Sequence, residues 1–317
     1  MAFDPNYRPR LGTMRRLDVA GAPPATTESA LEARRMTPRI TAPETLADRT
    51  GYLPDFLGDF HIEWPRPVGQ RQSDVLPIAS ISGENRLDYT NFSVTMSRSR
   101  RIALFVGVNI SGADSVKIER APDKWSYDGR VPLEAQVGED LYADNLLDRG
   151  HLVRREDPNW GEEAQTANED TFHFTNCSPQ MAGFNQKTWL SLEDYILKNT
   201  RRWKERVTVF SGPVFRDDDR EYRGVRIPTA YWKVVAFLSD DGRPSATAYM
   251  IDQSRELGAL EAAFGKFRTY QRSIAQIQEL TDLDFGRLSA LDGFSNEERA
   301  TGTRIETEVR GPADIRV

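Results

Sequence analysis

The sequence is poor in the residues that form disulfides and zinc sites. Of its 317 residues only one is a cysteine, Cys177, and three are histidines. A single thiol excludes an internal disulfide, and this composition essentially excludes a Cys/His zinc cage. The chain also lacks any apolar run near the roughly 18 to 20 residues that span a membrane. Its 38% hydrophobic residues and six tryptophans are enough for a substantial apolar core.

The N-terminus lacks the basic region and the apolar stretch of a secretory signal. We therefore expect a cytoplasmic protein with no membrane association, and an export route without such a signal stays open. The single cysteine fits a reducing compartment.

The sequence has no excess of positive charge, because its formal net charge is −6. This charge argues against passive coating of nucleic acid, which needs clustered Lys and Arg. The local electrostatic field at a groove nevertheless matters more than the net charge of the chain. Two basic groups are candidates for phosphate contact or for ordinary solvated faces: Arg98, Arg100 and Arg101, and Arg201, Arg202, Lys204 and Arg206.

The chain divides by composition into three parts. Residues 1–45 carry six prolines and little apolar periodicity, which predicts an extended or poorly ordered arm. Residues 46–300 are expected to form one domain, and residues 301–317 a C-terminal tail.

Within the domain the patterns predict an α+β fold with a mainly antiparallel central sheet flanked by helices. Strands are expected at 89–96, 102–110, 115–118, 148–153, 171–176, 207–215, 225–238 and 246–251. Helices are expected at 184–203, 267–280 and 256–266, where apolar residues recur at helical spacing in the first two. Residues 121–146 are predicted to be a long polar loop.

Chemically active side chains gather between residues 148 and 193. The stretch reads Asp148-Arg149-Gly150-His151, then Asn176-Cys177-Ser178-Pro179-Gln180, then Asn185-Gln186 through Trp189 to Glu193. It contains an imidazole, a guanidinium, carboxamides and two carboxylates. Together these groups suffice for metal-assisted cleavage of a phosphodiester.

The order and spacing of these motifs resemble those of the DNA/RNA non-specific endonuclease family, the Serratia-type and endonuclease G-like nucleases. The resemblance covers roughly residues 50–290. It implies a ββα-metal (His-Me finger) active-site motif, Mg²⁺ as cofactor with Mn²⁺ able to substitute, and DNA and RNA as substrates.

His151 is the predicted general base. Neutral imidazole can take a proton from water near neutral pH, and such catalysis contributes about 10²- to 10⁴-fold. The ring must be held as one tautomer, for which we expect a carbonyl or carboxylate on its other nitrogen. His61 and His173 are instead expected to be satisfied core histidines.

Asn185 is the predicted metal ligand, because a carboxamide oxygen suits Mg²⁺, an ion that shares few protein ligands with phosphate. A helix N-cap is the competing role. Glu193 lies eight residues further, about 80° around the helix and about 12 Å along it. We therefore assign Glu193 to holding a metal-bound water, against the alternative of an exposed helical glutamate.

The remaining motif residues are assigned to phosphate binding or support. Arg149 is expected to hold a phosphate oxygen, as the matching arginine does in the family. Arg120 resembles a second family arginine, or is a solvated residue at a strand end. Asp148 is expected to orient Arg149 or metal waters. Further supporting assignments are Gly150 for a tight backbone path, Asn176 for structural support, Gln180 for support or substrate contact, and Cys177 as a buried inert thiol.

The leading interpretation is a Mg²⁺-dependent endonuclease that cuts DNA and RNA with little sequence preference. The alternative is a catalytically silent nucleic-acid-binding or partner-binding module on the same fold, and a phosphodiesterase for small nucleotides is weaker still. Because an indiscriminate nuclease endangers its own cell, we expect restraint by an inhibitor or activator protein or by residues 1–45. A homodimer is also allowed.

Overall fold

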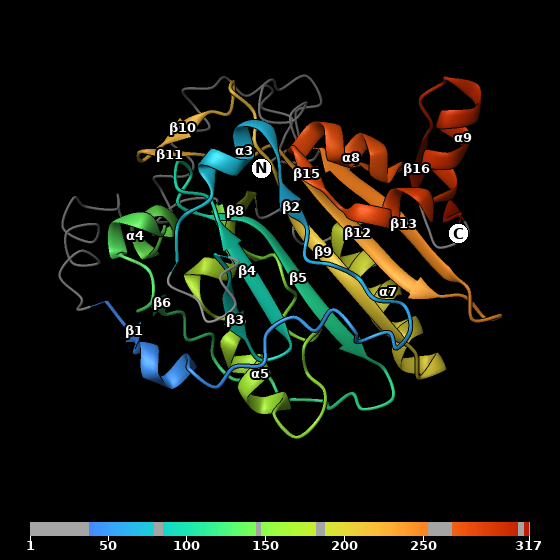
Figure 1. The fold of residues 1–317 in the computed structure, drawn as a ribbon. Coiled ribbons are helices and arrows are strands. Elements are labelled where there is room, and N and C mark those ends of the chain that lie inside the picture. Colours follow the sequence, from blue (N-terminus) through green and yellow to red (C-terminus); the bar gives the residue numbers. More distant parts are fainter. Residues whose placement is uncertain are drawn as a thin grey trace, which may run out of the picture.

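The computed structural model describes residues 38–78, 85–143, 147–181, 188–252, 268–309 and 314–316. Within these residues the fold is built on an eight-stranded sheet in which every neighbouring pair is antiparallel. The strands, in their order across the sheet, are β16 (Glu306–Val309), β14 (Arg268–Arg272), β13 (Pro244–Asp252), β12 (Ala230–Leu238), β9 (Arg206–Val214), β5 (Ala103–Ser111), β4 (Phe92–Met96) and β3 (Leu87–Tyr89). Figure 1 shows the long strands side by side in the middle of the molecule.

Helices and short paired segments surround this sheet. The helices are α3 (Gly69–Asp74), α4 (Glu139–Tyr142), α5 (Ala164–Asp170), α7 (Thr188–Trp203), α8 (Ile274–Thr281) and α9 (Gly293–Thr301). The 3-10 turns are η1 (Pro43–Leu46), η2 (Leu133–Ala135), η3 (Phe174–Asn176) and η5 (Gly286–Ala290). The two-stranded pairs are β1 (Ile40–Thr41) with β6 (Tyr127–Asp128), β2 (Arg66–Pro67) with β15 (Leu283–Asp284), β7 (Leu147–His151) with β8 (Cys177–Met181), and β10 (Glu221–Tyr222) with β11 (Val225–Arg226).

The sheet is buried on both faces, as the alternation along β12 shows. Trp232 and Val234 belong to one apolar cluster, together with Ile277 of α8. Tyr231 belongs to the other cluster, together with Leu197 of α7. Since successive strand residues point to opposite faces, α7 and α8 cover opposite sides of the sheet. In Figure 1, α7 lies behind the long strands.

The predicted fold class is confirmed. The strands predicted at 102–110, 207–215, 246–251 and 148–153 correspond to β5, β9, β13 and β7, and the one predicted at 225–238 contains β11 and β12. The nearly continuous apolar run at 102–110 is β5, whose residues are all buried. Segments with weaker patterns were assigned wrongly. Residues 89–96 form a hairpin, because Asn91 adopts a positive φ of 68° between β3 and β4. Residues 171–176 contain the turn η3 and precede β8, and Ser115 makes only an isolated bridge to Trp160.

The helix predictions also needed correction at their boundaries. The helix expected at 184–203 is α7, although its predicted first residues lie outside the described part. The segment 267–280 splits into β14 and α8, because Ser273 caps α8 by accepting a hydrogen bond from the Gln276 N–H. The helix expected at 256–266 lies outside the described residues. The loop expected at 121–146 contains β6, η2 and α4.

Segments beyond the predicted domain boundaries also pair with it. Residues 306–309, which the sequence placed in a C-terminal tail, form β16 at the edge of the main sheet. Residues 40–41, which the sequence placed in the N-terminal arm, pair in parallel with β6.

None of the helices that the structure describes is both long enough and apolar enough to cross a membrane.

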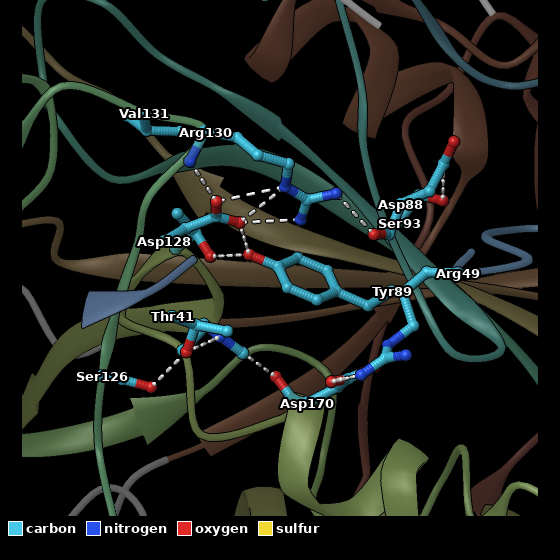
Figure 2. A network of polar contacts seen from close by, with 12 residues as sticks. Thr41, Arg49, Asp88, Tyr89, Ser93, Ser126, Asp128, Arg130, Val131 and Asp170 are labelled. Carbon is cyan, nitrogen blue, oxygen red and sulfur yellow. Dashed lines mark hydrogen bonds and ion pairs between the residues drawn. The ribbon is translucent and has the colours of Figure 1, made fainter. Parts of the chain in front are cut away.

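A buried polar network holds β3, β6 and the segment before β8 together (Figure 2). The Tyr89 hydroxyl lies 2.5 Å from both Asp128 Oδ2 and Thr175 Oγ1. Arg130 donates to Asp128 at 2.7 Å and to the Asp88 carbonyl at 2.8 Å, and its guanidinium lies over the Tyr89 ring. Although burial of Asp128 opposes ionisation, the bonds from Arg130 hold the pKa of this carboxyl below its usual value.

Replacing Arg130 with methionine is expected to destabilise the fold by about 3 to 5 kcal/mol, because Asp128 would remain buried without its cation. Arg304→Met is the matched control, since Arg304 pairs with Glu279 where both side chains are mostly exposed. Denaturant unfolding measures both variants. Equal, small losses of stability in the two variants would contradict this account of the network.

Candidate active site

The hairpin of β7 and β8 carries the histidine motif. Its register pairs His151 with Cys177, Arg149 with Pro179 and Asp148 with Gln180. Strand alternation therefore places Arg149 and His151 on one face of the hairpin, and Asp148 and Gly150 on the other.

The hairpin is fixed to the main sheet through Tyr231 of β12. The Tyr231 hydroxyl donates to the Pro179 carbonyl at 2.7 Å and lies 3.0 Å from Ser178 Oγ. Tyr231 is itself buried. The position of β8, and through it of His151, therefore depends on the middle of the sheet.

Gly150 packs closely against Gln180 within the hairpin. A Cβ at this position would lie 2.2 Å from Cδ and Oε1 of Gln180. The sequence predicted a tight backbone path here, whereas the close contact in the structure is with the Gln180 side chain. That carboxamide is buried, and neither of its polar atoms has a hydrogen-bond partner in the part of the chain that the structure describes.

Asn176 fixes the chain immediately after His151. Its Oδ1 accepts from the Val153 N–H at 2.9 Å, and its Nδ2 donates to the Val153 and Thr171 carbonyls at 3.0 Å each. The side chain is fully buried, so these three bonds satisfy its polar atoms. They are the contacts expected of a supporting residue.

The His151 ring is packed between aromatic rings. Trp125 lies 4.7 Å away between ring centroids, and Phe172 meets the imidazole edge to face at 5.0 Å. The Nε2 atom is covered and has no partner among the described residues. Burial, with smaller contributions from Arg155 and Arg120, lowers the pKa of His151 to about 3. In the described part of the chain, aromatic packing surrounds the ring where the sequence analysis expected a carbonyl or carboxylate.

Arg149 is engaged by a residue that the sequence analysis missed. Its Nε lies 3.2 Å from Glu139 Oε2, its Nη2 also pairs with Glu139, and its guanidinium lies over the Tyr142 ring. Asp148 is half-buried, and burial raises the pKa of its carboxyl despite the nearby Arg149. Glu139, on α4, thus makes the carboxylate contact that was expected of Asp148. No pattern in the sequence linked the two segments.

Glu193 points from α7 toward the sheet. Its side chain is largely buried, and Oε1 lies 3.0 Å from Lys233 Nζ. Lys233 is buried on β12 and also donates to Ser211 Oγ at 3.0 Å. Lys233 and Glu193 also act electrostatically on Asp157, six residues after His151. Burial, with Lys233 opposing it and Glu193 adding to it, raises the pKa of Asp157 to about 7. The sequence analysis singled out neither Lys233 nor Asp157.

The proposed metal ligand, Asn185, lies outside the described residues. Among the residues that are described, no group of three His, Cys, Asp or Glu side chains could hold an ion. His151 Nε2 has no hydrogen-bond partner among these described residues, and a buried nitrogen of this kind needs one, such as water or substrate.

Three further residues had roles predicted from the sequence. Cys177 is buried, and burial raises the pKa of its thiol to about 12, which suits an inert residue. His173 is a buried histidine bonded to Asp170 and Thr41, as expected. The prediction for His61 was wrong, because His61 is exposed and pairs with Asp55.

The two basic groups from the sequence include arginines that are held by the protein itself. Arg100 is buried against Asp219 at 2.8 Å. Arg201 pairs with Glu156 at 3.0 Å and donates to Ser115 Oγ. These two arginines are therefore structural, whereas Arg120 lies close enough to His151 to act on its charge.

The fold has a counterpart among solved structures. It resembles a chain in the crystal structure of the EndoG/EndoGI complex with a TM-score of 0.51 and 20% identity, over 63% of this chain and 85% of that one. At this level of identity the likeness shows a common fold.

Residues 76–290 match the model of the DNA/RNA non-specific endonuclease family, so the chain belongs to that family. The predicted family is thereby confirmed.

Similar curated proteins are consistent with membership of this family. An uncharacterized protein, y4fB, of Sinorhizobium fredii is 38% identical over 318 residues, which cover 92% of this chain and 47% of the relative. The mitochondrial endonuclease G of Bos taurus is 30% identical over 35% of this chain and 40% of its own length. A nuclease of Serratia marcescens is 29% identical over 36% and 43%, respectively. The chain thus spans less than half the length of each of these relatives.

The raised pKa of Asp157 predicts an unusual dependence of stability on pH. Between about pH 4 and pH 7 the unfolded carboxyl ionises while the folded one stays protonated, so this group lowers the stability of the wild type as pH rises. Asp157→Asn does not titrate. Its free energy of unfolding should therefore gain on the wild type by up to about 4 kcal/mol between these pH values.

Denaturant unfolding of both proteins at several pH values measures this difference. His151 acts in the opposite direction, because its lowered pKa makes stability fall as pH drops from about 6.5 toward 3. That contribution is common to both proteins and cancels. A constant difference between the two stability curves would disprove the assignment.

Proposed function

We propose that this protein is a metal-dependent endonuclease that hydrolyses phosphodiester bonds in both DNA and RNA. The observation that carries the proposal is His151. In a chain of this family, it stands at the end of a braced hairpin, its covered Nε2 has no partner among the described residues, and Arg120 and Arg155 lie nearby.

In this proposal His151 takes a proton from the attacking water. A pKa of about 3 keeps the ring neutral at physiological pH, but a base this weak accepts protons poorly. Arg120 and Arg155 contribute to the low value in the free protein. A phosphate bound among these groups would bring negative charge, favour the imidazolium and strengthen the base when substrate is present.

The phosphate itself would be held by arginines. Arg120 and Arg155 supply positive charge near His151, and Arg149 supplies a planar fork on the same face of the hairpin. Arg149 is paired with Glu139. It must therefore either bind Glu139 and the phosphate together or break the ion pair with Glu139 to bind the phosphate. Contacts with phosphates position the nucleic-acid backbone without reading the bases, so cleavage would show little preference for nucleotide sequence.

The metal is proposed to be Mg²⁺, with Mn²⁺ able to substitute, bound through Asn185. When bound, it would offset charge on the phosphate and on the leaving oxygen. Glu193 is proposed to hold a water beside this ion, and Asp148 to orient Arg149 or such waters. The Gln180 carboxamide, buried beside Gly150, is a further candidate for substrate contact.

For partners, we propose nucleic acid as substrate and keep an inhibitor or activator protein and a homodimer as further proposals. The proposal of an inhibitor is supported by the similar solved structure, which is an EndoG/EndoGI complex that concerns the inhibition of EndoG.

Replacing His151 with alanine is expected to lower the cleavage rate of plasmid and of RNA by about 10²- to 10⁴-fold, because the base is lost. The control is His61→Ala, since His61 is exposed and pairs only with Asp55 among the described residues. Digestions run with Mg²⁺ and with EDTA. Equal cleavage by wild type and His151→Ala would refute the proposal, and binding without cleavage by the wild type would favour a silent module.

Asn185→Ala is expected to weaken Mg²⁺ or Mn²⁺ binding at least tenfold, since the one proposed side-chain ligand is removed. Titration calorimetry of the purified protein measures this without any assay of cleavage. Asn296→Ala, at an exposed site on α9, is the control. Unchanged ion affinity in Asn185→Ala would place the metal elsewhere.

A further inference from the structure

Two aromatic rings from separate segments pack against the proposed base. Trp125 precedes β6, Phe172 follows α5, and His151 ends β7. Trp125 faces the imidazole with an interplanar angle of 47°, and Phe172 meets it nearly perpendicularly, at 85°. Trp125 and Phe172 also contact each other, with centroids 5.4 Å apart. We call this arrangement the aromatic slot.

The slot is fixed by backbone bonds as well as by packing. Ser126, next to Trp125, donates its N–H to the Phe172 carbonyl at 3.0 Å and accepts from the Phe174 N–H at 3.0 Å. The Phe174 ring also stacks on Trp125 at 5.7 Å. Trp125 and Phe172 are therefore held in register with each other, and the imidazole fits against a preformed wall.

The chemistry of this wall favours an uncharged ring. Apolar rings exclude water from the imidazole, and loss of hydration disfavours the imidazolium. The charged groups that act on His151 are Arg155 and Arg120, and both oppose a further positive charge. Attraction between a cation and the Trp125 ring acts the other way. Burial is the largest cause, so the pKa of His151 falls.

We propose that Trp125 is a positioning residue for His151: together with Phe172 it holds the imidazole in one orientation and keeps it uncharged until a substrate phosphate arrives. This inference rests on the proposed function in that His151 is the base. It adds a residue outside the Asp-Arg-Gly-His motif, and it explains why a histidine without a described hydrogen-bond partner is still held in place.

A direct test is an NMR titration of the imidazole signals in the full-length protein. The chain has only three histidines, so the spectrum of His151→Ala assigns the His151 signals. In the wild type His151 should stay neutral to about pH 4, in line with its pKa of about 3. In Trp125→Ala its proton affinity should rise at least tenfold, and Trp125→Phe should restore most of the wild-type behaviour.

Lys124→Ala is the matched control, because Lys124 is an exposed neighbour in the same segment. Phe172→Ala opens the slot from its other side and should shift the titration in the same direction, which keeps the test valid if Trp125→Ala does not fold. An unchanged His151 titration in a folded Trp125→Ala or Phe172→Ala protein overturns the proposal.

Cleavage kinetics separate a positioning role from substrate stacking. For a positioning residue, Trp125→Ala should move the acidic limb of the kcat/KM profile to higher pH and leave KM for an oligonucleotide within about twofold. A large rise in KM with an unmoved His151 titration would instead make Trp125 a stacking contact for substrate and would end the proposal. Because the titration needs no turnover, it tests the slot even if the protein cleaves nothing.

Discussion

The site depends on the removal of water from one imidazole. His151 is packed against Trp125 and Phe172, and its pKa falls because the charged ring loses hydration. An imidazole with such a low pKa is neutral at physiological pH and can accept a proton, but it is a weak base. In the proposed mechanism the phosphate of a bound substrate would supply negative charge and so strengthen this base.

The distribution of charge around the hairpin follows the same logic. Positive charge from Arg120 and Arg155 lies near the imidazole, although the whole chain is acidic with a formal charge of −6. Two nearby carboxylates have cationic partners of their own, because Glu139 pairs with Arg149 and Glu193 with Lys233. A local positive field in an acidic protein is what selective contact with a phosphate backbone requires. It also explains why net charge alone was a poor guide to function.

Sequence patterns predicted the parts of this protein in which one local signal dominates. The continuous apolar run of β5 and the motif around His151 are such cases, and both fold class and family followed from them. Patterns failed where a single residue interrupts a segment. The positive φ of Asn91 turns one expected strand into a hairpin, and Ser273 caps a helix inside a segment expected to be helical throughout.

Residues that act across segments were also beyond reach of the sequence. The pairing of Glu139 with Arg149 and that of Lys233 with Glu193 join residues 10 and 40 positions apart, and the aromatic slot unites three segments. The sequence analysis singled out Gly150. Its close contact with the Gln180 carboxamide, however, depends on the register of two strands. Contacts of this kind become visible only once the chain is folded.

The central claim, that a bound phosphate turns a weak base into an effective one, is open to one direct measurement. The His151 imidazole is titrated by NMR with and without an oligonucleotide whose phosphodiesters are replaced by uncleavable, equally charged phosphonates. The account predicts that its pKa rises by at least one unit in the complex. A value that stays the same or falls when the oligonucleotide is bound would contradict it.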